Sequence, residues 1–141
     1  MNKLEKLRTY LLEGPLKIRS KELLTFAEKG KVFSSQNPND KSFGISYRAN
    51  IILAPFTGSF NAVNFILLNW LQENQTNLKE EDIAFHVDII DHETSHVSWE
   101  FPLSEIIKVI PQDEGHTLSA QIEANVFGFD IYDLTKNQTL P

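Results

Sequence analysis

The class of fold follows first from the stretch Phe43-Gly44-Ile45-Ser46-Tyr47-Arg48-Ala49-Asn50-Ile51. Large apolar side chains at positions 43, 45, 47 and 51 share one parity, and the alternate positions 44, 46, 48 and 50 are small or polar. Because successive side chains of a strand point to opposite faces of a sheet, this pattern predicts a half-buried strand. Residues 32–36 predict a partner strand, joined to the first by the turn-forming sequence Asn37-Pro38-Asn39-Asp40.

The same alternation returns in the second half of the chain. It covers residues 85–89 and again residues 97–101, and the polar residues 91–95 between them are few enough for an antiparallel hairpin. Residues 103–110 and 118–122 predict a further strand pair around the turn Asp113-Glu114-Gly115. Apolar residues at 127, 129 and 131 close the regular part.

Three segments instead show helical spacing. Leu4, Leu7 and Leu11 form one apolar stripe that Gly14-Pro15 ends, and a second short helix is predicted from Ser20 to Gly30. Residues 60–74 carry the widest stripe, which predicts the most buried helix of the chain.

These elements predict an α+β fold. It consists of a largely antiparallel sheet on which the N-terminal helices and one long central helix pack. We expect a single domain over residues 1–135 and a short C-terminal tail over residues 136–141. A chain of 141 residues buries roughly two-thirds of its unfolded surface, so the fold requires no metal or disulfide.

Composition excludes several classes of function. The chain has no cysteine, which removes disulfide scaffolds, thiol nucleophiles and thiolate zinc sites. Its net charge of −6, with no basic patch, disfavours stable binding to nucleic acid. No secretory signal and no apolar run of membrane-spanning length is present, so we expect a cytoplasmic protein that does not enter the membrane.

One motif suggests catalysis. His92-Glu93-Thr94-Ser95-His96 matches the H-E-x-x-H pattern of zinc hydrolases. That chemistry requires a helix, which places both imidazoles on one face. Here the motif lies between two stretches in which apolar and polar residues alternate, so a hairpin between two strands is the preferred interpretation. We therefore assign no catalytic residue, no metal ligand and no cofactor, and keep a zinc-dependent hydrolase as the alternative.

Aromatic residues suggest contacts between copies of the chain. Trp70 and Leu71 end the stripe of the central helix, and Asn74 and Gln75 are placed to bond its free C-terminal carbonyls. The pair Trp99 and Phe101 adds more aromatic surface than one small core requires, so we predict that these two contribute to an interface.

Residues 47–110 resemble a known family, and the similarity is strongest over residues 47–91. The elements that carry the resemblance are Tyr47-x-x-x-Ile51, Phe56-Thr57-Gly58-Ser59-Phe60, Trp70-Leu71-Gln72-Glu73-Asn74-Gln75, and the strand and polar turn that follow. Together they are similar to the tail completion protein R (GpR) family of contractile-tailed temperate phages and prophages. The family-motif residues are Phe56, Gly58, Phe60, Trp70, Leu71, Asn74 and Gln75. The chain ends soon after Leu134, without the longer Pro-rich C-terminus of some members.

The resemblance implies a tail-terminator-like virion assembly protein, not an enzyme. It would complete the head-proximal end of the tail so that the tail can join the head. Its partners would be copies of itself in a ring, a hexamer by analogy, together with the tail tube and other tail completion or head–tail joining proteins. It would be found in the host cytoplasm during assembly and then in the virion tail. A generic binding module remains a further alternative.

Overall fold

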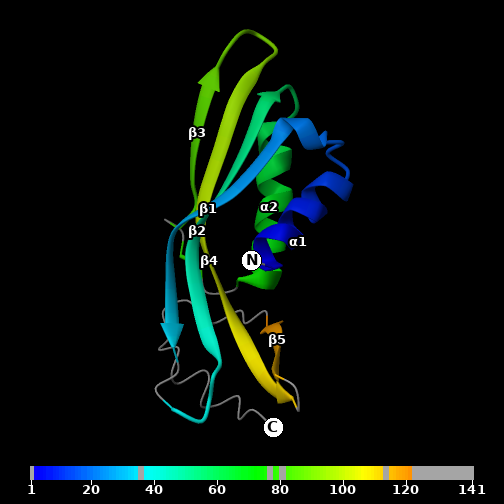
Figure 1. Ribbon diagram of the computed structural model, residues 1–141. Helices are drawn as coiled ribbons and strands as arrows, with labels where there is room; N and C mark the ends of the chain where they lie inside the picture. The colour runs from blue at the N-terminus through cyan, green and yellow to red at the C-terminus, as the bar shows by residue number, and fades with distance from the viewer. Residues whose placement is uncertain (1, 35–36, 76–77, 80–81, 113–114, 122–141) are drawn as a thin grey trace.

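The computed structural model describes residues 2–34, 37–75, 78–79, 82–112 and 115–121. It confirms an α+β architecture in which two helices lie on one face of an antiparallel sheet (Figure 1). The apolar positions 127, 129 and 131 and the predicted domain boundary at 135/136 lie outside the described residues. The elements are α1 (Asn2–Glu13), a 3-10 turn (Ser20–Glu22), β1 (Leu23–Ser34), β2 (Phe43–Phe56), α2 (Phe60–Asn74), β3 (Ala84–Ile89), β4 (Ser95–Gln112) and β5 (Gly115–Gln121).

The strand β4 organises the sheet. The order is β1-β2-β4-β3, and β5 also pairs with β4. β2 runs along one side of β4, whereas β3 pairs with residues 95–100 and β5 with residues 106–112 of the other side. Residues 101–105 of β4 therefore have an edge that no strand among the described residues covers.

The sequence predicted two strands where β4 is one strand of 18 residues. The two predicted strands meet at Pro102, and proline cannot donate to a strand ladder. In the structure Pro102 lies opposite Arg48 of β2 and falls in the uncovered stretch between β3 and β5. The missing N–H is tolerated there, so the prediction of two strands was wrong.

The predicted second N-terminal helix was also wrong. Only a 3-10 turn occupies Ser20–Glu22, and the residues after it form β1. β1 pairs with β2 from Leu23↔Leu53 to Ser34↔Phe43, with a bulge between Glu28 and Lys31. Lys29 in this bulge has a φ of 53°, the left-handed region in which a side chain is unfavourable. The predicted partner strand thus begins nine residues earlier than residue 32.

The two remaining helices follow their sequence patterns. In α1 the stripe Leu4, Leu7 and Leu11 is buried, as predicted. α2 spans the predicted residues 60–74, and Ser59 caps it by accepting a hydrogen bond from the backbone N–H of Ala62. The expected single long central helix is not observed as such. Two helices of 12 and 15 residues share the task of covering the sheet.

The core lies between these helices and the sheet. β2 contributes Tyr47, Ala49, Ile51 and Leu53, which face Leu103, Phe101, Trp99 and Val97 of β4 in register. All eight side chains are buried. No helix within the described ranges is long and apolar enough to span a membrane.

Candidate functional site

The H-E-x-x-H segment forms a hairpin turn, as the alternating flanks predicted. The backbone carbonyl of Thr94 accepts hydrogen bonds from the N–H groups of Ile90 and Asp91 at 3.0 and 3.1 Å. The Asp91 carboxylate in turn accepts from the N–H groups of Glu93 and Thr94, both at 2.8 Å. These two bonds lower the pKa of Asp91.

The motif therefore lacks the geometry that zinc chemistry needs. His92 lies in the turn and His96 lies in β4, so the two are not on one helical face. Within the part of the chain that the structure describes, no group of three or more His, Asp or Glu side chains is arranged to hold a metal ion. His92 and Glu93 line an open depression together with Phe56 and Gly58.

The family-motif residues around the start of α2 have packing roles. A side chain at Gly58 would come within 3.2 Å of the Phe56 ring, so glycine lets the chain turn closely over that ring. Phe60 opens α2 and stacks on Trp99, with ring centroids 5.6 Å apart. The Phe60 ring also packs against the Phe85 ring of β3, with ring centroids 4.9 Å apart. This aromatic row joins α2 to two strands.

The residues at the other end of α2 complete the helix. Trp70 and Leu71 are buried in the core. Asn74 donates to the Trp70 carbonyl at 2.8 Å, as predicted, and the backbone N–H of Gln75 donates to the Leu71 carbonyl at 2.7 Å. The Gln75 side chain, predicted to bond a carbonyl of this helix end, reaches across to β4.

The interface role predicted for Trp99 and Phe101 requires correction. Both point toward the helices, and their exposed fractions are 1% and 0%. Trp99 also donates its indole N–H to the side-chain oxygen of Asn64 in α2 at 2.7 Å. The parity of β4 assigns them to the core, so within the protomer neither side chain is available to another copy.

Sequence reasoning missed a buried polar cluster at the uncovered stretch of β4. Glu105 accepts hydrogen bonds from the backbone N–H groups of Asn2 and Lys3, at 3.0 and 3.3 Å. These are first-turn donors of α1 that have no partner within the helix. Glu105 thus caps a helix that lies more than a hundred residues earlier. The available signal was an acidic residue on the apolar parity of β4.

Gln75 completes this cluster. Its side-chain oxygen accepts from the Lys3 ammonium at 2.8 Å and from the backbone N–H of Ser104 at 3.3 Å. Its amide nitrogen donates to the Ser104 hydroxyl at 3.3 Å. Gln75 therefore supplies a partner to a β4 amide in the gap between β3 and β5. Because buried polar groups need partners, the cluster fixes both helices to the sheet.

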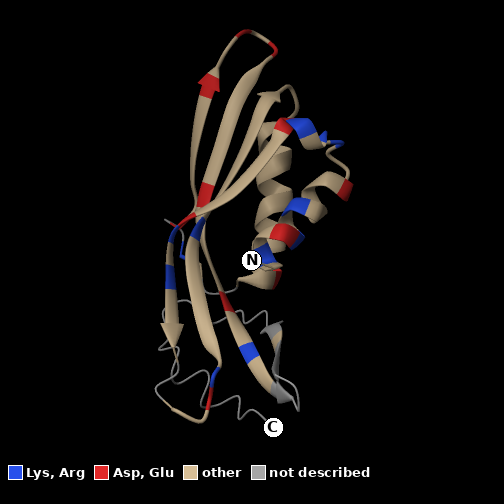
Figure 2. Ribbon diagram, in the orientation of Figure 1, with Lys and Arg blue, Asp and Glu red and all other residues tan. Residues whose placement is uncertain are grey.

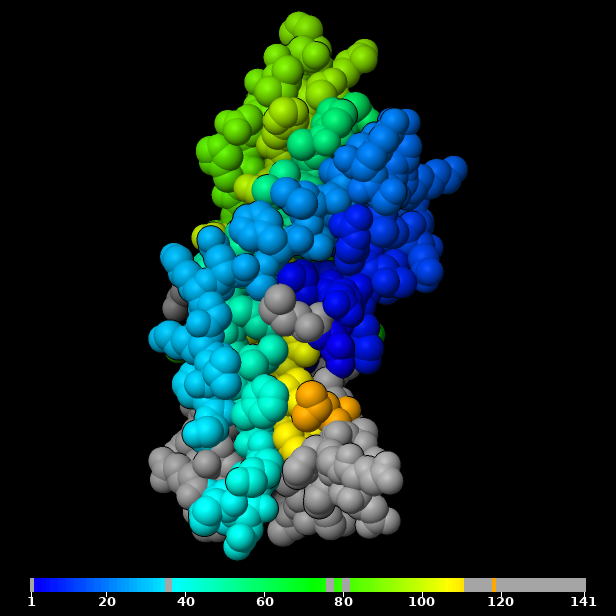
Figure 3. Space-filling model, in the orientation of Figure 1, coloured from blue at the N-terminus to red at the C-terminus, as the bar shows by residue number. Residues whose placement is uncertain are grey.

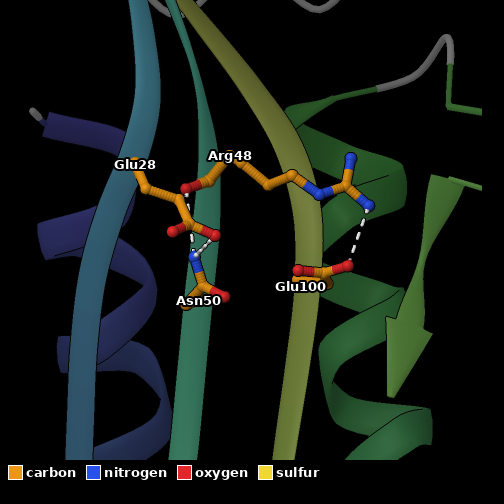
Figure 4. A network of polar contacts seen from close by, with 4 residues as sticks. All are labelled: Glu28, Arg48, Asn50 and Glu100. Atoms are coloured by element: carbon orange, nitrogen blue, oxygen red, sulfur yellow. Dashed lines mark hydrogen bonds and ion pairs between the residues drawn. The ribbon is translucent and has the colours of Figure 1, made fainter. Parts of the chain in front are cut away.

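On the opposite face of the sheet, which no helix of the described residues covers and which we call the bare sheet face, lies a second polar network. Figure 4 shows Glu28, Arg48, Asn50 and Glu100 on the side of the strands away from both helices. Arg48 lies 3.3 Å from the Glu100 carboxylate, and Asn50 donates to Glu28 at 3.3 Å. Three strands are joined in this way, and the charge of Arg48 is balanced within the face.

Apolar side chains are exposed at the two outer strands, β1 and β3. In β3 the exposed fractions are 61% for Phe85 and 80% for Ile89, and in β1 the fraction for Leu24 is 56%. Within the described residues, neither strand pairs with another along its outer edge. Such edges are sites at which a further strand can add.

Charges of opposite sign lie beside these two edges. Asp88 is exposed near the end of β3, and Asp91 and Glu93 are exposed in the hairpin turn that follows it. Lys17, Arg19 and Lys21 are exposed in the segment that leads into β1. Figure 2 shows the acidic group at the upper tip and the basic group on the other side of the same end. In the space-filling view the basic segment forms a projecting surface beside β1 (Figure 3).

Comparison with known proteins identifies the family. No curated protein and no solved structure shows significant similarity to the chain. The family model for P2 phage tail completion protein R (GpR) matches residues 1–125, which includes every described element. The resemblance noted over residues 47–110 therefore extends through both helices and all five strands of the described residues. The chain belongs to the P2 phage tail completion protein R (GpR) family.

Proposed function

We propose that the chain completes the head-proximal end of a contractile tail so that the tail can join the head. It acts through contacts with copies of itself and with other tail components, not through catalysis. The match of the family model to residues 1–125 carries this proposal. The exposed apolar edges of β1 and β3 support it, since an assembly protein needs surfaces that remain open until a partner arrives.

The active form would be a ring, with six copies by analogy with other tail terminators. A ring requires a head-to-tail contact that closes on itself. Its other partners would be the tail tube and the proteins that join tail to head. Assembly would take place in the host cytoplasm, and the finished ring would remain in the virion tail.

The channel of this ring should be neutral or acidic, so that DNA passes without binding. The net charge of −6 per chain disfavours contact with phosphates. The pairing of Arg48 with Glu100 on the bare sheet face works in the same direction. A strongly basic channel in an assembled ring would contradict this expectation.

A complementation experiment tests the proposal. Cells that produce the tails are deprived of this chain, and the particles are counted by electron microscopy. We expect separate heads and tails, and joined particles once the chain is supplied again. Light scattering of the purified chain with and without tail tubes then reports whether rings form on the tube. Normal joining in the absence of the chain would overturn the proposal.

A further inference from the structure

The two outer strands of the sheet run in opposite directions. Neighbours in the order β1-β2-β4-β3 are all antiparallel, and the path has an even number of strands. A second copy placed beside the first in the same orientation therefore brings its β1 next to β3 with antiparallel polarity. The alternation of strand direction then continues from one copy to the next without interruption.

The strand registers predict which residues would meet. Leu24 faces Ile52, Ile52 faces Ser98, and Ser98 faces His86, so these four residues form one row across the sheet. Leu24 and His86 end this row at opposite edges. In a ring whose copies lie at the same height, Leu24 of one copy is level with His86 of the next.

The same placement brings an acidic and a basic group to one end of the contact. In this register Asp88 is level with Glu22, which is ion-paired with Arg19 at 2.6 Å. The hairpin residues Asp91 and Glu93 continue beyond this level, at the end of the sheet where Lys17 and Lys21 are exposed. Contacts between two β1 edges or two β3 edges would join surfaces of like charge composition. Charge complementarity therefore favours contact between unlike edges, which is the geometry that closes a ring.

We propose that copies of this chain associate by sheet extension, with β3 and its acidic hairpin in one copy against β1 and its basic leading segment in the next. This inference rests on the ring of the proposed function and assigns its contact. The Leu23 N–H already donates to the Ser20 carbonyl, and the Leu23 carbonyl accepts from Arg8 at 2.9 Å. Backbone hydrogen bonds between copies therefore fall to Thr25 and Phe85, which are level in this register, and the exposed side chains of Leu24 and Phe85 become covered. The acidic and basic groups select the correct pair of edges.

Cysteine cross-linking tests the contact directly, because the natural chain has no cysteine. Leu24→Cys and His86→Cys are made in chains with different affinity tags and mixed under mild oxidation. Adjacent residues of paired strands lie within the Cα distance that a disulfide spans. We expect cross-linked dimers in the mixture, little cross-linking in either variant alone, and a ladder of oligomers from the chain with both substitutions.

Leu24→Cys mixed with Phe65→Cys is the matched control. Phe65 is exposed on α2 and belongs to neither edge strand, so it should give no dimers. Cross-linking of Leu24→Cys with itself, as strong as in the mixture, would indicate a two-fold contact and overturn the proposal. If the purified chain stays monomeric, the same oxidation is applied to tails that contain it, and absence of the mixed cross-link there also overturns it.

Charge reversal gives an independent test. Lys17→Glu with Lys21→Glu makes both edges acidic, and Asp88→Lys with Glu93→Lys makes both edges basic. Each double variant alone should associate at least tenfold more weakly, whereas a mixture of the two should recover association with alternating copies. Failure of the mixture would overturn the edge assignment.

The two proposals fail differently. If the charge variants still join heads to tails as well as the natural chain does, the contact is wrong and the tail-completing function stands. If the chain is absent from tails and dispensable for joining, the function itself is wrong.

Discussion

Tyr47 of β2 donates its phenolic hydrogen to the Glu105 carboxylate of β4 over 2.6 Å, and both side chains are buried. The same carboxylate caps α1, so one acidic group connects the sheet to the N-terminal helix. Burial raises the pKa of Tyr47 well above its usual range, and the hydrogen bond to Glu105 raises it further. Tyr47 therefore remains a hydrogen-bond donor at neutral pH.

Glu105→Ala should destabilise the fold strongly. It removes the acceptor of the buried Tyr47 hydroxyl and of two first-turn amides of α1. We expect a loss of about 3 kcal/mol in the free energy of unfolding, measured by urea denaturation. Glu100→Ala is the control, since its surface pair with Arg48 should change stability by less than about 1 kcal/mol. Equal effects of the two substitutions would contradict the capping role.

Tyr47 should make the free energy of unfolding depend on pH in the alkaline range. Below a pH of about 10, both the folded and unfolded states hold the phenolic proton, and the residue adds no pH dependence. Above that pH, the unfolded chain releases the proton while the folded chain keeps it. The free energy of unfolding then falls as the pH rises, by up to about 1.4 kcal/mol per pH unit.

Urea denaturation across this range measures the effect. Tyr47→Phe should reduce the slope, and Tyr10→Phe, at an exposed position, should leave it unchanged. An unchanged slope in Tyr47→Phe would rule out the raised pKa.

Asp91 should make the hairpin turn sensitive to acid. Its pKa is lowered by the backbone hydrogen bonds from Glu93 and Thr94. The stabilising effect is present above the pKa of the unfolded chain and is lost as the pH falls through the lowered value. We expect the protection of the Glu93 and Thr94 amide protons, taken relative to the intrinsic exchange rate at each pH, to fall in acid, as measured by NMR. In Asp91→Ala this protection should be lost at neutral pH as well.

Trp99 should contribute through packing. Trp99→Ala leaves a cavity beside Phe60 and frees the side chain of Asn64, so we expect a loss of about 4 kcal/mol. Phe65→Ala removes an exposed aromatic ring from α2 and should cost less than about 0.5 kcal/mol. Thermal unfolding of both variants makes the comparison. A small effect at Trp99 would place it outside the core.

The histidine motif should bind no structural zinc. His92 and His96 lie in a turn and a strand, so we expect no stoichiometric zinc in the purified protein by elemental analysis. Glu93→Gln should leave tail joining intact. One zinc per chain that disappears in His92→Ala would revive the hydrolase alternative.

Much of the fold could be predicted from the spacing of apolar residues alone. The stripe of α1, the limits of α2 and the hairpin between β3 and β4 all follow patterns that are local in sequence. Residues 20–30 were misassigned because Leu23, Leu24 and Phe26 fit both a helical turn and a strand. Their pairing with β2, a contact between distant residues, decides in favour of the strand.

The candidate sites were harder to predict. The motif H-E-x-x-H can bind zinc only if it forms a helix. The alternating residues on either side of it predicted strands instead, and the structure has strands there. Trp99 and Phe101 were assigned to an interface by residue type, whereas their parity in β4 places them in the core. The exposed apolar residues of β1 and β3 could not be identified before the strand order was known.

The cap on α1 also has a consequence for synthesis of the chain. Residues 2–13 leave the ribosome first, but the carboxylate that holds them is encoded about a hundred positions later. The N-terminal helix must wait, undocked, until most of the protein has been translated. A product truncated before Glu105 would lack that anchor, so incomplete copies are poorly suited to enter a growing particle.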